Sequence, residues 1–245
     1  MITIAVANNK GGTGKTTTTI HLGQLLAAAG WITALIDFDG QANLTNSYAV
    51  ETDEAFGTPG IVDLIRNTRP LADVLIPVAE NLFLCPSSPR LDDVADEMTT
   101  RPLQIFRLKT ALDSAKGLDV VIIDCPPNLG SLTYSALIAS THLIVPVEPD
   151  GWSIDGLQRT VSKLPELQKE IGHAPQLLGT VATKVREDLL AHRTSLTVLH
   201  GLGVPVLAEI PRREGVDAEG QLNAAYRPVA DAVIGLLEKG EGVGR

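Results

Sequence analysis

The chain has 245 residues, 44% of them hydrophobic, and its formal net charge is −9 at neutral pH. Such a chain can bury one sizeable core, so we expect a single α/β domain over residues 1–239 and a flexible Gly-rich tail at residues 240–245. No apolar run reaches the roughly 18 residues of a membrane span, and no signal-peptide pattern opens the chain. We therefore expect a soluble cytoplasmic protein without a membrane partner. Two cysteines exclude a disulfide framework or a zinc site.

Short apolar runs alternate with helical patterns along the whole chain, which predicts a mostly parallel, twisted sheet with helices on both faces. Residues 2–7 form the first expected strand, and residues 16–29 have apolar side chains at helical spacing. Further strands are expected at residues 33–36, 82–85, 120–123, 143–147, 177–182 and 204–210. The rest of residues 48–100, with ten acidic and three basic residues, is predicted to form short helices and loops. The last helix is expected at residues 227–239.

A glycine-rich loop connects the first strand to the first helix. Its residues are Lys10, Gly11, Gly12, Thr13, Gly14, Lys15 and Thr16. Glycines let consecutive backbone N–H groups wrap a phosphate chain, and the following helix N-terminus favours an anion. The pattern predicts that Lys15 reaches the β- and γ-phosphates of ATP and that Thr16 binds Mg²⁺. A turn without a ligand is the alternative. Asn9 stands where the general pattern has glycine, and Lys10 precedes the glycines.

Acidic residues follow two of the predicted strands. Asp124 emerges at the carboxyl end of an apolar run, where ligands of open α/β sheets bind, and is expected to hold Mg²⁺. Asp37 and Asp39 follow another apolar run and are candidates for orienting a water or the metal. For each of the three, capping the next helix is the alternative.

Three separated segments resemble the ParA and MinD superfamily of P-loop ATPases. The loop from Lys10, which continues through Thr17, is similar to its deviant Walker A motif, in which a signature lysine precedes the glycines. Residues 122–130, Ile-Ile-Asp-Cys-Pro-Pro-Asn-Leu-Gly, resemble the switch II segment of ParA and Soj. Ile210, Pro211 and Arg212 resemble an Ile-Pro-Arg segment near the nucleotide base. The motifs occur in the family's order and cover most of the chain.

The resemblance implies a homodimer that forms with ATP and Mg²⁺ and binds duplex DNA nonspecifically on the nucleoid. A ParB-like centromere-binding protein would stimulate its slow hydrolysis, and the cycle would drive plasmid or chromosome partition. In this reading Lys10 reaches the partner subunit's nucleotide, Asp39 matches the switch I aspartate that positions the attacking water, and Asp124 matches the Walker B residue. Lys10, Lys15 and Asp39 are then the catalytic residues, and Thr16, Asp39 and Asp124 the metal site. We expect a short form without an N-terminal helix-turn-helix.

One segment departs from the family pattern. Where the family usually has Asp-Pro-Gln-Gly, this chain has Asp39, Gly40, Gln41 and Ala42. The acid and the glutamine are retained, but the altered backbone leaves the role of Asp39 less secure than ATP binding.

DNA binding is expected in the more basic part of the chain. Residues 151–213 hold eight basic and six acidic residues. Arg186, Arg193 and Arg213 are the candidate DNA contacts, with Arg212 as a candidate that could equally lie near the base. A solvated face with scattered arginines is the alternative.

Two other functions use similar motifs. A relative that positions a protein cargo over the nucleoid would have the same ATPase, and a metabolic P-loop enzyme would act on a small molecule without binding DNA.

Overall fold

A computed structural model of the chain describes residues 1–50, 58–186, 188–212 and 218–240. Its centre is an eight-stranded sheet in the order β3-β4-β2-β5-β1-β6-β7-β8, parallel except for β3, which runs antiparallel to β4. The predicted fold class, a mostly parallel sheet covered on both faces, is confirmed. The strands are β1 Ile2–Val6, β2 Thr33–Asp37, β3 Ile76–Ala79, β4 Leu82–Cys85, β5 Val120–Asp124, β6 His142–Val147, β7 Gln176–Val185 and β8 Val206–Pro211.

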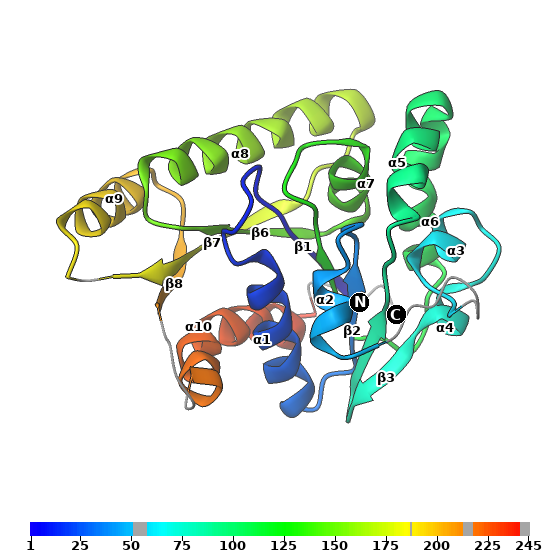
Figure 1. Ribbon diagram of the computed structural model, residues 1–245, viewed down its shortest axis with the longest axis horizontal. Helices are drawn as coiled ribbons and strands as arrows, with labels where there is room; N and C mark the ends of the chain where they lie inside the picture. The colour runs from blue at the N-terminus through cyan, green and yellow to red at the C-terminus, as the bar shows by residue number, and fades with distance from the viewer. Residues whose placement is uncertain (51–57, 187, 213–217, 241–245) are drawn as a thin grey trace.

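Helices lie on both faces of the sheet (Figure 1). They are α1 Lys15–Ala28, α2 Asn43–Ser47, α3 Ile61–Ile65, α4 Leu71–Val74, α5 Leu91–Thr100, the 3₁₀ segment η1 Pro102–Phe106, α6 Arg107–Asp113, α7 Ser131–Ala139, α8 Gly151–Ile171, α9 Leu190–Gly201 and α10 Ala218–Glu238. In Figure 1, α8 crosses above the strands while α1 and α10 lie side by side below them. Among the described residues, no helix combines the length and the apolarity that crossing a bilayer requires.

The side chains of the central strands divide between two cores because successive residues of a strand point to opposite faces. On β5, Val120 and Ile122 pack with α1 and α10, whereas Val121 and Ile123 pack with the helices of the other face. All four are fully buried. Burial on both faces explains why these strands are continuous apolar runs in the sequence.

The carboxyl ends of three neighbouring strands bring the predicted acids and the glycine-rich loop together. Asp37 at the end of β2 and Asp124 at the end of β5 are register partners, and Val6 at the end of β1 is the partner of Asp124 on its other side. The loop from Lys10 to Thr16 follows β1 directly. The candidate site therefore lies at one edge of the sheet, where parallel strands end together.

The structure corrects two of the predicted elements. β3, in a stretch predicted to hold only helices and loops around one strand, is an edge strand that contains Pro77 and alternates between half-buried and exposed residues. An edge strand tolerates a residue without an N–H, which is why its pattern escaped detection. The last helix, predicted at residues 227–239, runs from Ala218 to Glu238 and contains Pro228 in its interior. Of the predicted tail only Gly240 lies among the described residues.

The packing of α1 against the sheet leaves no space at Gly23. A Cβ on this residue would lie 2.5 Å from Leu35 Cδ2 on β2, closer than real contacts allow. At its other side, Thr18 on α1 shares a hydrogen bond of 3.1 Å with the buried Tyr226 hydroxyl on α10. The helix that follows the loop is thus fixed between the sheet and α10.

Candidate nucleotide-binding site

The loop after β1 has the backbone that its glycines predict. Gly12 and Gly14 have φ angles of 75° and 84°, in the left-handed region that other residues rarely adopt. A Cβ on Gly14 would also lie 3.1 Å from Thr183 Cγ2. The Thr183 hydroxyl donates to the Thr13 carbonyl at 2.8 Å, so the end of β7 anchors the loop. These contacts shape a cradle that a side chain at Gly14 would fill.

Lys15 is the cation inside this cradle. Its side chain is buried, and its amine donates to the Lys10 carbonyl at 3.1 Å. Burial lowers its pKa from the ordinary value, although the nearby Asp124 carboxylate opposes the shift. A buried ammonium beside loop amides is a receptor for a polyphosphate.

Thr16 and Asp124 form the part of the site that fits Mg²⁺. The Thr16 hydroxyl donates to Asp124 Oδ2 at 2.7 Å, while the buried Asp124 Oδ1 has no hydrogen-bond partner. Burial raises the pKa of Asp124 to about 8, against the effect of the Thr16 hydrogen bond. A buried carboxylate oxygen without a partner is costly, and a divalent cation or its water would satisfy it. The residues present therefore fit the metal.

Mg²⁺ does not require a site in which every ligand comes from the protein. Among the described residues, no three His, Cys, Asp or Glu side chains gather at one point. Mg²⁺ is usually held by one or two protein oxygens together with waters and substrate phosphates, which is the donor set that Thr16 and Asp124 offer here.

Asp37 and Asp39 differ in their surroundings. Asp37 is fully buried, and its Oδ2 accepts hydrogen bonds from the Thr45 amide at 2.8 Å and the Thr45 hydroxyl at 2.6 Å. Burial raises its pKa to about 6 despite these bonds. Asp37 thus satisfies an amide of the first turn of α2, which is the helix-capping alternative. Asp39 is half-buried, accepts from the Gln41 amide at 3.1 Å, and lines the phosphate side of the site.

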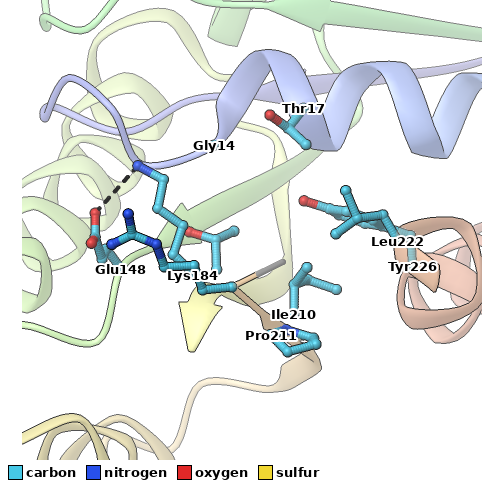
Figure 2. A pocket seen from close by; sticks show the side chains of 10 residues that line it. Gly14, Thr17, Glu148, Lys184, Ile210, Pro211, Leu222 and Tyr226 are labelled. Atoms are coloured by element: carbon cyan, nitrogen blue, oxygen red, sulfur yellow. Dashed lines mark ion pairs between the residues drawn. The ribbon is translucent and has the colours of Figure 1, made fainter. Parts of the chain in front are cut away.

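Two adjoining pockets surround the loop. The phosphate pocket, of about 360 Å³, is lined by Gly11, Gly12, Gly14, Lys15, Thr16, Thr17, Asp39, Gln41, Asn43, Pro127 and Lys184. The nucleoside pocket, of about 370 Å³, is lined by Gly14, Thr17, Glu148, Thr183, Lys184, Ile210, Pro211, Arg212, Leu222 and Tyr226 (Figure 2). Gly14, Thr17 and Lys184 belong to both. The first pocket contains the loop, Lys15 and Asp39, and the second adds the side chains of Ile210, Leu222 and Tyr226, so the two together can take the phosphate end and the base end of a nucleotide.

Lys10 is oriented differently from the rest of the loop. Its amine lies 2.6 Å from Asp150 Oδ2, just before α8, and Lys10 is not among the described residues that line either pocket. Thr13, another predicted nucleotide ligand, also lines neither pocket, because its side chain is buried and its hydroxyl donates to the Lys10 carbonyl at 3.4 Å. Lys10 is the predicted ligand whose charged side chain is instead engaged by an acid outside both pockets.

Sequence reasoning missed Lys184, Glu148, Leu222 and Tyr226 as pocket residues. They come from the ends of β7 and β6 and from α10, elements whose positions depend on the sheet order. The one available signal was the rule that ligands bind beyond the carboxyl ends of parallel strands, which applies to Glu148 and Lys184.

The candidate DNA contacts lie together in part. The Arg186 amide donates to His192 Nδ1 at 3.2 Å, so its backbone contacts the residue before Arg193 in the first turns of α9. Both arginines are exposed, but the Arg186 guanidinium is paired with Asp188 Oδ2 at 3.0 Å. Arg212 lines the nucleoside pocket, and Arg213 lies outside the described residues.

The fold and the site define the class: this is a P-loop nucleotide-binding protein whose site suits a magnesium–nucleotide complex. Comparison with known proteins narrows the class. The AAA domain family matches residues 1–177. The chain is 32% identical to the sporulation initiation inhibitor protein Soj of Bacillus subtilis, over 85% of this chain and 78% of that protein. It is 30% identical to the chromosome partitioning protein ParA of Caulobacter vibrioides, over 85% of this chain and 80% of that protein.

A solved structure from Mycobacterium smegmatis has the same fold. It is named cobyrinic acid a,c-diamide synthase and contains ADP and magnesium. It is 30% identical to this chain and covers 98% of it, with 96% of its own length covered, at a TM-score of 0.87. The chain belongs to the ParA/Soj family of P-loop ATPases, as its loop and switch segments indicated.

Proposed function

We propose that this protein is a DNA-partition ATPase of the cytoplasm and nucleoid. With ATP and Mg²⁺ it forms a homodimer that binds duplex DNA without sequence preference. A ParB-like centromere-binding partner stimulates its slow hydrolysis and so releases it from DNA. The names of the Soj and ParA relatives support the cellular role.

The orientation of Lys10 is the observation that carries the proposal. A lysine that served its own chain's phosphates would line the phosphate pocket, but this one pairs with Asp150 outside it. In the proposed dimer Lys10 exchanges Asp150 for the phosphates bound by the partner subunit. A cation delivered in this way stabilises the charge that shifts during phosphoryl transfer only after assembly, which couples hydrolysis to dimerisation.

In this proposal the other site residues bind the phosphates, bind the metal or position the attacking water. Mg²⁺, when bound, neutralises phosphate charge and polarises the scissile bond. Lys15 and the loop amides hold the phosphates, Thr16 and Asp124 hold the metal, and Asp39 orients the attacking water. Pro211 and Arg212 adjoin the base, consistent with their position in the lining of the nucleoside pocket.

The experiment measures binding to random duplex DNA with ATP, with ADP and without nucleotide, at low and high salt. We expect binding with ATP alone, and an affinity that falls steeply with salt because phosphate contacts release counterions. Arg186→Glu with Arg193→Glu should remove this binding and leave ATP binding intact. Arg90→Glu with Arg101→Glu, an equal charge reversal on two exposed arginines flanking α5, is the control. DNA binding that ignores nucleotide would contradict the proposal.

The name of the mycobacterial structure favours a second candidate, ATP-dependent conversion of a carboxylic acid to an amide. This reaction consumes a carboxylate and an ammonia donor and yields the amide, ADP and phosphate. This candidate predicts that ATP turnover requires both the carboxylate and the ammonia donor and does not change when DNA is added. A cargo-positioning ATPase, in contrast, would bind DNA as proposed but respond to a protein other than a centromere-binding one.

A further inference from the structure

Lys184 occupies an unusual place at the end of β7. Its φ angle is 53°, in the left-handed region that a non-glycine residue rarely adopts. The pairing of β7 with β8 shifts register between Ala182 and Val185, so Lys184 lies in a bulge. Bulges redirect side chains, and this one turns Lys184 toward the glycine-rich loop. The neighbouring Thr183 hydroxyl, bonded to the Thr13 carbonyl, keeps the segment against the loop.

The Lys184 amine contacts two oxygen atoms of the protein. It donates to the Gly12 carbonyl at 2.5 Å and lies 3.6 Å from Glu148 Oε2 (Figure 2). The Lys184 and Glu148 side chains retain 44% and 28% of their exposure, so solvent and ligands can reach both. An exposed ion pair of this kind is weak and can exchange partners at little cost.

Lys184 is also the charged member of the three residues that both pockets share. Gly14 and Thr17, the other two, open α1. A nucleotide that fills both pockets passes this junction with the phosphates nearest its sugar. Figure 2 shows the lysine directed at the loop, with Leu222 and Tyr226 across the nucleoside pocket from it.

We propose that Lys184 contacts the phosphates nearest the sugar of a bound nucleotide, and that its amine leaves the Gly12 carbonyl and Glu148 for these phosphates when the nucleotide binds. This inference rests on the proposed binding of ATP and names a further binding residue of that site. The ligand class is a nucleoside di- or triphosphate. Lys184 adds a charge at the inner phosphates, whereas Lys15 serves the outer ones.

The charges predict effects of opposite sign for the two residues. Removing the lysine charge takes a cation away from the phosphates and weakens binding. Removing the glutamate charge takes away an anion that competes for the lysine and repels the phosphates, and so strengthens binding. A purely structural role, in which the pair only supports the loop, predicts that both changes weaken binding. Adenosine, which carries no phosphate, should not respond to either change.

The experiment is calorimetric titration of the full chain with MgADP, MgATP and adenosine. Lys184→Met should raise the dissociation constants of MgADP and MgATP by a similar factor of about three to ten, Lys184→Arg should stay near the wild type, and Glu148→Gln should lower both constants by about threefold. Lys163→Met and Glu166→Gln, which break a surface ion pair of similar chemistry on α8, are the control and should change nothing. Thermal unfolding of each variant without ligand checks that it folds.

The outcomes are separable. If the wild type binds no nucleotide, the proposed function fails. If the wild type binds MgADP and MgATP but Lys184→Met does not weaken either, or Glu148→Gln weakens them as Lys184→Met does, the inference about Lys184 is overturned and the proposed function stands.

Discussion

Lys10 and Asp150, 140 residues apart in the sequence, form an ion pair of 2.6 Å beside the phosphate loop. Both side chains keep about a third of their exposure, so the pair adds little to stability. Its importance lies in where it holds the Lys10 amine. The pair occupies the lysine in the single chain and must break before the lysine can act elsewhere.

Lys10→Ala should therefore leave nucleotide binding within a few-fold of the wild type, because Lys10 does not line the pockets. The ATP-dependent dimer should be lost. Sedimentation with ATP and with ADP measures this, and Lys15→Ala, which removes the cation inside the cradle, should instead abolish nucleotide binding. A normal ATP dimer of Lys10→Ala would contradict its role in the partner's site.

Asp37 and Asp39 should respond differently to the same substitution. Asp37→Ala leaves the Thr45 amide and hydroxyl without their acceptor inside the protein, so we expect a loss of about 2 to 4 kcal/mol in the free energy of unfolding. Asp39→Ala, at a half-buried position, should change stability by less than about 1 kcal/mol but reduce ATP turnover at least tenfold. Urea unfolding and phosphate release separate the two. Equal losses of stability in the two variants would contradict the different roles assigned to Asp37 and Asp39.

Ala42, the last residue of the segment that departs from the family pattern, has an unusual backbone conformation. It has a φ angle of 53°, so alanine adopts at this position the left-handed backbone that the glycine of the family pattern adopts freely. Ala42→Gly should raise the free energy of unfolding by up to about 1 kcal/mol. It should also change ATP turnover, because the residue begins α2 beside Asp39.

Ala49 provides the matched control, since its φ angle is 51° and it is exposed outside both pockets. Ala49→Gly should relieve similar strain without changing turnover. If both variants leave turnover at the wild-type level, the backbone of the switch segment does not limit hydrolysis.

Asp124 predicts a pH dependence that Mg²⁺ should remove. Its pKa is raised from 3.8 to about 8 by burial, so the folded protein binds a proton that the unfolded chain has already lost. Stability without metal should therefore fall as pH rises between about 4 and 8. Saturating MgADP should flatten this slope between about pH 6 and 8, where Asp124 rather than Asp37 titrates, since the metal replaces its proton.

Asp124→Asn should flatten the slope between about pH 6 and 8 without any ligand and raise stability at pH 8 by about 1 to 2 kcal/mol. A slope between about pH 4 and 6 should persist, because burial also raises the pKa of Asp37 to about 6. The same variant should lose the ability of Mg²⁺ to tighten ADP binding. Thermal melts across this pH range, with and without MgADP, measure both effects. An unchanged slope between about pH 6 and 8 in Asp124→Asn would assign the pH dependence in that range to another group.

Much of this architecture was predictable because the strands buried on both faces are short apolar runs that end in chemically distinctive residues. Asp124 follows such a run, and the loop from Lys10 to Thr16 has a spacing that few other structures require. The residue types therefore predicted both the sheet and the phosphate half of the site.

The nucleoside half depended on contacts between distant segments. Tyr226 reaches the pocket because α10 packs on α1, and no local pattern encodes that pairing. Lys184 reaches it through a bulge, which is set by the neighbouring strand rather than by the sequence around the lysine. Asp37 was left open for a similar reason, since only the position of Thr45 decides between capping and catalysis.

Gly23 packs closely on Leu35, and this contact bears on which parts of the site can change position when a nucleotide binds. Because α1 packs closely against β2 and is joined to α10 through the Thr18–Tyr226 hydrogen bond, we expect the helix behind the phosphates to move little when a nucleotide binds. Whether the third phosphate is present must then be transmitted by the loops beyond β2 and β5. Those loops carry Asp39 and Pro127, both of which line the phosphate pocket, so we expect them, rather than the helix, to change position with the nucleotide state.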